Sequence, residues 1–142
     1  MAQVDRVFPK LQFKDPVELV FDPSGTRLWV LEVGGRLVSF APRADVGAAD
    51  LALDLSQVRQ PFAQALGFAF HPGFATNRFV YLVYVVRDRD PAGTRLSRFR
   101  VEPTDPPRVD PASEQIVLTW MGGGHNGSSL QFGPDGFLYV ST

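Results

Sequence analysis

Apolar residues recur along the chain in short runs and do not form the long stripes of amphipathic helices. Twelve prolines and thirteen glycines are spread between these runs, a spacing that favours many short strands. We expect nine strands and no amphipathic helix. The expected strands are Val17–Phe21, Arg27–Val33, Arg36–Phe40, Ala65–Phe70, Arg78–Val86, Arg95–Val101, Ile116–Trp120, Ser128–Phe132 and Phe137–Ser141. The pattern predicts an all-β fold.

Two of the expected strands differ in how their side chains alternate. The run Arg78–Val86, RFVYLVYVV, is apolar on both faces, so it needs cover on both sides. The run Arg95–Val101, RLSRFRV, places two arginines on one face, which is typical of an outer strand. Apolar inner strands and charged outer strands indicate a propeller blade. The intervening RDRDPAG, residues 87–93, is expected to be a solvated connection whose charges have no binding role.

Three connections share one pattern: an apolar strand, a phenylalanine, any residue, a proline, a short turn and a second strand. The phenylalanines are Phe21, Phe70 and Phe132, which lie 49 and 62 residues apart, near or beyond the roughly 40 to 50 residues of a propeller blade. Pro134–Gly136 has the chemistry of a hairpin turn. We therefore predict an incomplete β-propeller of about two and a half blades, at roughly residues 15–60, 61–120 and 121–142.

Composition excludes several classes of function. Fourteen basic and fifteen acidic residues give a net charge of −1, which argues against a nucleic-acid or anionic-membrane partner. The absence of cysteine excludes disulfides, thiolate metal sites and a cysteine nucleophile. No run approaches the roughly 18 apolar residues of a membrane span, and the start, MAQVDRVFPKLQF, lacks the apolar segment of a signal peptide.

The candidate chemistry lies near the end of the chain, where His125 stands in the glycine-rich segment GGGHNGSS. Glycine lets a backbone approach a ligand closely, and imidazole exchanges protons near neutral pH. The other histidine, His71, is expected to be a turn or packing residue, and two histidines so far apart give no metal-binding spacing. The lysine and helix of a phosphate-binding loop do not accompany these glycines, so the segment is not a nucleotide-binding loop. It is where an imidazole, His125, could be offered to a substrate.

Five blocks in order resemble the glucose/sorbosone dehydrogenase-like family of six-bladed propellers, which are soluble, depend on pyrroloquinoline quinone (PQQ) and include hedgehog-interacting-protein-like domains. The blocks are PVELVFDPSGTRLWVLEVGGRL, LGFAFHPGFATNRFVYLVY, RLSRFRV, DPASEQIVL and HNGSSLQFGPDGFLYVST. The resemblance implies that His125 removes a hydroxyl proton from a sugar or other alcohol while hydride passes to the quinone. It also implies substrate contacts at Asn126 and Gly127.

The resemblance implies further features of a longer parent protein. Its cofactors would be PQQ and calcium, held by residues beyond Thr142, and its electron acceptor a cytochrome c. Its location would be the periplasm or the cell exterior. In relatives an aspartate that orients the histidine also follows the last strand, so we expect this chain to be an amino-terminal fragment, inactive alone, with no metal site of its own.

Two positions depart from the sugar-oxidising members of the family. Phe62 stands where those members have a sugar-contacting glutamine, with Gln60 and Gln64 out of register, and Gly124 stands where they have an acidic residue. A non-catalytic propeller that binds a protein or carbohydrate is therefore the alternative. A lactonase on a similar propeller would need a set of carboxylate and asparagine metal ligands, which the sequence does not offer.

Overall fold

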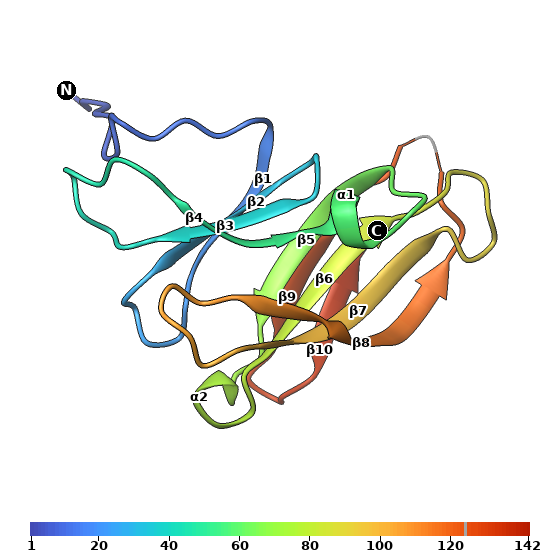
Figure 1. Ribbon diagram of the computed structural model, residues 1–142. Helices are drawn as coiled ribbons and strands as arrows, with labels where there is room; N and C mark the ends of the chain where they lie inside the picture. Colours follow the sequence, from blue (N-terminus) through green and yellow to red (C-terminus); the bar gives the residue numbers. More distant parts are fainter. Residues whose placement is uncertain (124) are drawn as a thin grey trace.

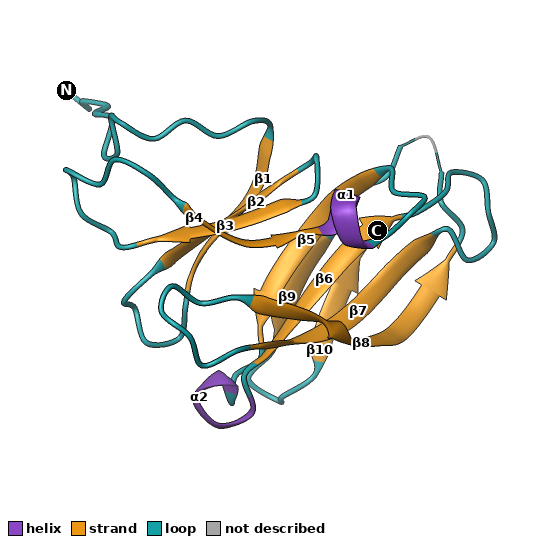
Figure 2. Cartoon of the chain, in the orientation of Figure 1, coloured by secondary structure: helices purple, strands orange, loops and turns teal. Residues whose placement is uncertain are grey.

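The computed structural model describes residues 1–123 and 125–142, which form three antiparallel sheets (Figures 1 and 2). The first sheet has the strand order β1-β2-β3-β4, the second β5-β6-β7-β8, and the third pairs β9 with β10. The first sheet contains β1 (Pro16–Phe21), β2 (Leu28–Glu32), β3 (Arg36–Phe40) and β4 (Asp50–Asp54). The second contains β5 (Gln64–Phe70), β6 (Phe79–Val85), β7 (Thr94–Val101) and β8 (Val109–Trp120), and the third β9 (Ser129–Phe132) and β10 (Leu138–Ser141). The predicted all-β fold is confirmed.

An apolar seam joins the first and second sheets. Trp29 of β2 stacks on Phe68 of β5 with ring centroids 5.9 Å apart, and Phe70 meets the same indole edge-on at 5.4 Å. Leu31, Leu37 and Leu82 are fully buried in the same cluster. Aromatic pairs of this kind add about 0.5–1.5 kcal/mol each beyond the area they bury. The two four-stranded sheets therefore share one core, which we call the first seam.

A second seam joins the second and third sheets. Val83, Val85 and Leu96 pack there with Leu130 of β9. Strand β6 contributes to both seams, because Val80, Leu82 and Tyr84 face the first and Val83 and Val85 the second. Its apolar residues on both faces predicted this central position, and the prediction is confirmed.

The strands that begin the three sheets lie beside one another, since β5 contacts both β1 and β9. A backbone hydrogen bond of 2.8 Å from the Ala65 amide to the Val33 carbonyl ties β5 to the first sheet. The start of the third sheet packs against Gly67 of β5, where a Cβ would lie 3.5 Å from the Ser128 carbonyl oxygen and 3.6 Å from the Leu130 side chain. The three sheets thus lie side by side, and their first strands, β1, β5 and β9, are neighbours in that order.

Four details of the predicted elements were wrong. Strand β4 was missed, and β8 begins at Val109 instead of Ile116, because both are outermost strands whose polar, partly exposed residues lack an apolar signal. Strand β7 is not the outer strand, since β8 pairs beyond it. Two short helices, α1 (Leu55–Val58) and α2 (Phe74–Asn77), were not expected; each is a single turn at a sheet corner, too short for a periodic pattern.

The predicted hairpin turn between β9 and β10 is confirmed. Gly136 has a φ of 82°, and its amide donates to the Gly133 carbonyl at 3.0 Å. Asp135 accepts from the Phe137 amide at 3.1 Å and from the Tyr139 hydroxyl at 2.7 Å. These bonds lower the pKa of Asp135, the tyrosine contributing most. Glycine is needed at position 136 because L side chains rarely adopt this φ.

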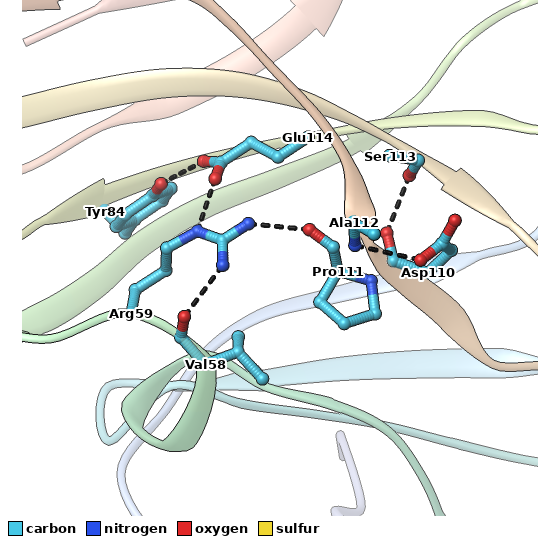
Figure 3. A network of polar contacts seen from close by, with 8 residues as sticks. All are labelled: Val58, Arg59, Tyr84, Asp110, Pro111, Ala112, Ser113 and Glu114. Atoms are coloured by element: carbon cyan, nitrogen blue, oxygen red, sulfur yellow. Dashed lines mark hydrogen bonds and ion pairs between the residues drawn. The ribbon is translucent and has the colours of Figure 1, made fainter.

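A polar network closes the outer end of the first seam (Figure 3). Arg59, which follows α1, pairs through Nε with the Glu114 carboxylate of β8, and its Nη2 donates to the Pro111 carbonyl at 2.6 Å. The Tyr84 hydroxyl donates to the same carboxylate. Burial, and then this bond to Glu114, raises the pKa of Tyr84. One carboxylate therefore joins the first sheet's corner to two strands of the second.

We predict that Glu114→Gln lowers the free energy of unfolding by about 2–3 kcal/mol, since it leaves a largely buried guanidinium unpaired. The Glu114 and Arg59 side chains are only 11% and 21% exposed. The matched control is Asp45→Asn in the exposed Arg43–Asp45 pair, 72% and 78% exposed, where a loss below about 1 kcal/mol is expected. Denaturant titration measures both, and equal losses would contradict the assigned role.

A second prediction concerns Glu18 on β1, whose pKa is raised because burial disfavours the carboxylate. The folded state holds this proton to a higher pH than the unfolded state, so the group's contribution to stability is lost as pH rises from 4.5 through the folded value. Glu18→Gln should therefore raise the melting temperature at neutral pH, and the gain should vanish below pH 4.5. The pKa of the Asp135 carboxyl is lowered, the opposite of Glu18, so Asp135→Asn should lower the melting temperature at neutral pH. A Glu18→Gln gain that persists in acid would exclude this explanation.

Candidate functional site

Because consecutive strands are antiparallel, successive loops lie alternately at the two ends of the strands. We call each set of strand ends, with its loops, an edge of the structure. Residues 33–35, 55–63, 86–93, 121–123 and 125–128 form the His125 edge. Residues 22–27, 41–49, 71–78, 102–108 and 133–137 form the opposite edge. In Figure 1, α1 lies at the first of these edges and α2 at the second.

The segment that carries His125 is fastened to the loop of residues 86–93. The Arg89 amide donates to the Gly122 carbonyl at 2.7 Å, and the Gly122 amide donates to the Asp90 carbonyl at 3.2 Å. Asn126 continues the attachment, since its Nδ2 donates to the Asp88 carboxylate at 3.3 Å. Its Oδ1 accepts from the Gly123 amide at 2.8 Å. The two loops thus form one layer on the His125 edge.

Glycine is required where these two loops touch. A Cβ at Gly122 would lie 2.8 Å from the Arg87 carbonyl oxygen and 3.3 Å from the Asp88 Cα. Both neighbours are backbone atoms, so they cannot rotate away. Gly127, five residues on, is exposed, with nothing within 4 Å of the corresponding position. The segment is therefore tightly packed at its start and open at Gly127.

The structure places the predicted site residues as follows. His125 is exposed, and none of the residues in the described ranges hydrogen bonds to its imidazole. Asn126 is half-buried and serves the loop contacts above. Gly127 exposes bare backbone beside them. An exposed imidazole thus stands next to an amide and an unobstructed peptide segment.

The departures from the sugar-oxidising pattern have different positions. Phe62 is half-buried and packs against the first seam. Its ring Cζ lies 2.7 Å from the position that a Cβ of Gly35 would take. Gln60 bonds the Ser56 carbonyl within its own loop, and Gln64 belongs to β5. Gly124 lies outside the described residues. Phe62 is therefore part of the packing between two loops of the His125 edge.

His71 lies on the opposite edge from His125. Its Nδ1 accepts from the Gly73 amide at 2.8 Å and lies 2.9 Å from Asn77 Nδ2. Its ring packs against Tyr81 and Phe132 at centroid distances of 6.3 and 5.3 Å. These contacts agree with the expected role in turn formation and packing.

Sequence reasoning missed the contribution of residues 87–90, which it interpreted as a solvated connection with no binding role. These residues supply three of the contacts that hold the His125 segment. A Cβ at Gly93, within this loop, and a Cβ at Gly122, in the segment before β9, would both meet the Arg87 carbonyl oxygen. Without the three-dimensional pairing, nothing connected these glycines.

Within residues 1–123 and 125–142, no group of three or more His, Cys, Asp or Glu side chains is arranged to hold a metal ion. No helix in this described part is long and apolar enough to cross a membrane.

Comparison with known proteins decides the family. The family model for glucose/sorbosone dehydrogenase matches residues 13–142. The chain belongs to the glucose/sorbosone dehydrogenase family. Hedgehog-interacting proteins of Mus musculus and Homo sapiens are each 28% identical to it over 142 aligned residues, which cover 89% of this chain and 20% of theirs.

Two solved structures show the same fold. The PQQ-bound aldose sugar dehydrogenase of Streptomyces coelicolor matches with a TM-score of 0.70 and 22% identity, over 89% of this chain and 37% of that one. A putative oxidoreductase (glucose dehydrogenase) of Thermus thermophilus matches with a TM-score of 0.68 and 28% identity, over 91% of this chain and 37% of that one. The predicted incomplete β-propeller is confirmed: this family member spans about two and a half blades. The blade boundaries near residues 60 and 120 stay a prediction.

We predict that Gly122→Ala separates the two loops, because the new methyl group meets fixed backbone atoms. The free energy of unfolding should fall by about 1–3 kcal/mol, and the NMR signals of His125 should shift with it. Gly127→Ala is the matched control in the same segment and should change neither. If both variants behaved like the parent, the close contact at Gly122 would be refuted.

Proposed function

We propose that this chain supplies the proton-accepting part of a PQQ-dependent sugar or alcohol dehydrogenase. The observation that carries the proposal is the exposed His125, presented on a segment fastened at Gly122 and Asn126, in a chain of the glucose/sorbosone dehydrogenase family. A general base must be fixed in place yet accessible to the hydroxyl it deprotonates. His125 is accessible, and the segment that carries it is held at Gly122 and Asn126; further sheets would have to orient the imidazole itself.

We propose a separate role for each of His125, Asn126 and Gly127. His125 accepts the hydroxyl proton of the substrate while the carbon is oxidised. Asn126 keeps one amide hydrogen beyond its two loop contacts, which suits it to orient a substrate oxygen. Gly127 lets the substrate approach the backbone, since nothing lies within 4 Å of the position that a Cβ would take.

The described residues do not fit PQQ as a complete site. The quinone carries several carboxylates and needs fixed cations, whereas Arg87 and Arg89 in the loop beside the His125 segment are exposed. We therefore propose that PQQ, and the calcium that accompanies it, are held by further sheets of the propeller. Alone, this chain should not oxidise sugars. We further propose a cytochrome c as electron acceptor and a location in the periplasm or outside the cell.

A non-catalytic binding propeller is the second candidate. Hedgehog-interacting proteins, whose name describes binding to another protein, cover 89% of this chain at 28% identity. Phe62 also favours this alternative. It packs against the first seam, so position 62 offers a sugar no polar side chain. Under this alternative the His125 edge would contact a protein or a carbohydrate without chemistry.

The test uses a chain in which residues 1–142 are continued by the remaining sheets of the propeller, supplied with PQQ, calcium and an aldose. We predict dye reduction whose kcat falls about 10²–10⁴-fold in His125→Gln, with little change in KM. The matched control is Gln57→Glu on α1, exposed on the same edge, which should leave kcat unchanged.

Two results would contradict the proposal. Dye reduction by the 142-residue chain alone would show that the further sheets are not needed. Failure of the extended chain to bind PQQ in a calorimetric titration would favour the binding propeller.

A further inference from the structure

The chain contains two asparagines, Asn77 and Asn126, and only Asn126 is followed by glycine. The side-chain amide of an asparagine can be attacked by the backbone nitrogen of the next residue, which closes a succinimide ring. Glycine favours this attack, because it has no Cβ and gives the backbone a wide choice of conformations. The dipeptide Asn126–Gly127 is therefore where ring closure at an asparagine meets the least steric hindrance.

The attacking nitrogen of Gly127 is accessible in the folded chain. Gly127 is exposed, and nothing lies within 4 Å of the position that a Cβ would take. No residue of the described chain accepts a hydrogen bond from its backbone amide. Attack by this nitrogen therefore breaks no contact of its own.

The side-chain oxygen of Asn126 already has a hydrogen-bond donor. Its Oδ1 accepts from the Gly123 amide at 2.8 Å. This oxygen gains negative charge when Cγ is attacked, and a backbone N–H about 2.7–3.1 Å from such an oxygen stabilises that charge. The contact that closes the turn from Gly123 to Asn126 thus also favours attack at Cγ.

The side-chain nitrogen of Asn126, which must leave, also has a partner. Its Nδ2 donates to the exposed carboxylate of Asp88 at 3.3 Å. A carboxylate in contact with a leaving nitrogen can carry the proton that the attacking nitrogen gives up. Asp88 is therefore placed to assist the departure of ammonia.

The other asparagine differs at the attacking nitrogen. Asn77 is followed by Arg78, whose backbone amide already donates to the Phe74 carbonyl at 2.9 Å. The Asn77 side chain is also held within its turn, since Oδ1 accepts from the Phe79 amide at 2.9 Å and Nδ2 lies 2.9 Å from His71 Nδ1. Asn77 thus serves as an internal control.

We propose that Asn126–Gly127 is a self-modification site, which converts the amide beside His125 into a carboxylate. The Gly127 nitrogen forms a bond to Cγ of Asn126, the bond from Cγ to Nδ2 breaks, and the Gly127 amide proton leaves with Nδ2 as ammonia. Water then opens the succinimide to aspartate or isoaspartate. The reaction consumes one water, releases one ammonia and needs no oxidant or reductant.

The product changes how the His125 segment is held. A carboxylate at position 126 no longer donates to Asp88, and the two like charges repel each other. The segment then keeps only its backbone contacts at Gly122 with the loop of residues 86–93. The modification does not depend on the function proposed for His125, because it requires only contacts within this chain.

The test incubates the folded 142-residue chain at neutral and mildly alkaline pH, and mass spectrometry follows the peptides that contain Asn77 and Asn126. The Asn126 peptide should gain the mass difference between an amide and an acid, faster at the higher pH because the attacking nitrogen must lose its proton. The Asn77 peptide should stay unchanged. The same chain in denaturant reports the reactivity of the sequence alone, and the folded chain should convert at least as fast.

Two variants and a matched control assign the roles. Gly127→Ala should slow the conversion about tenfold or more, an increase of at least about 1.4 kcal/mol in the barrier, because a methyl group hinders the attack. Asp88→Ala should also slow it about tenfold or more, since the proton carrier is lost. The control is Asp90→Ala in the same loop, whose carboxylate accepts from the Ala92 amide at 2.9 Å; it should leave the rate unchanged.

Four results would each overturn the proposal. They are an Asn126 that stays intact in the folded chain while it converts in denaturant, equal conversion at Asn77, an unchanged rate in Gly127→Ala, and a rate in Asp88→Ala that equals or exceeds that of the parent.

Discussion

The stacking of Trp29 on Phe68 across the first seam is the contact on which the other features of the chain depend. Neither four-stranded sheet can bury its inner face alone, because that face is lined by leucine, valine and aromatic side chains. Packing the two sheets together removes those faces from water, which is the main driving force for folding. The seam also fixes where the corner of one sheet meets the strands of the next.

The packing of the sheets also fixes the positions of the loops on the His125 edge. Strand β6 takes part in both seams, and the loop that follows it reaches back to the segment before β9 through Arg89, Asp90 and Asp88. The position of the histidine is thus set by a loop that β6 and β7 hold in place. On the other edge the same seam leaves a cavity beneath Trp29. The first seam therefore positions both the His125 edge and this cavity.

The sequence alone predicted the structure correctly where the alternation of apolar residues was strong. It predicted the all-β fold, the central position of β6 and the hairpin at Gly136, because these depend on local chemistry and on which faces are apolar. It failed at β4 and the first half of β8, since outer strands such as DLALD and VDPASEQ are partly solvated and resemble loops. Packing of neighbouring strands, not propensity, makes them strands.

The candidate sites show the same limit. His125 was found because histidine in a glycine-rich loop is unusual, and the resemblance gave it a role. The docking of Asp88 and Arg89, the network of Arg59 and the cavity at Trp29 could not be predicted, since each joins residues that lie 30 or more positions apart. Such contacts are set by the sheets' mutual position, which a single sequence does not encode locally.

Backbone amide hydrogen exchange measures whether this chain fastens its sheets and its loops to one another. The Ala65 amide, bonded to the Val33 carbonyl between sheets, and the Arg89 amide, bonded to Gly122 between loops, report the two attachments. We predict that the Ala65 amide exchanges as slowly as the amides within β6 and that the Arg89 amide exchanges more slowly than that of the exposed Gly127. Exchange of Ala65 at the rate of an exposed loop amide would contradict it.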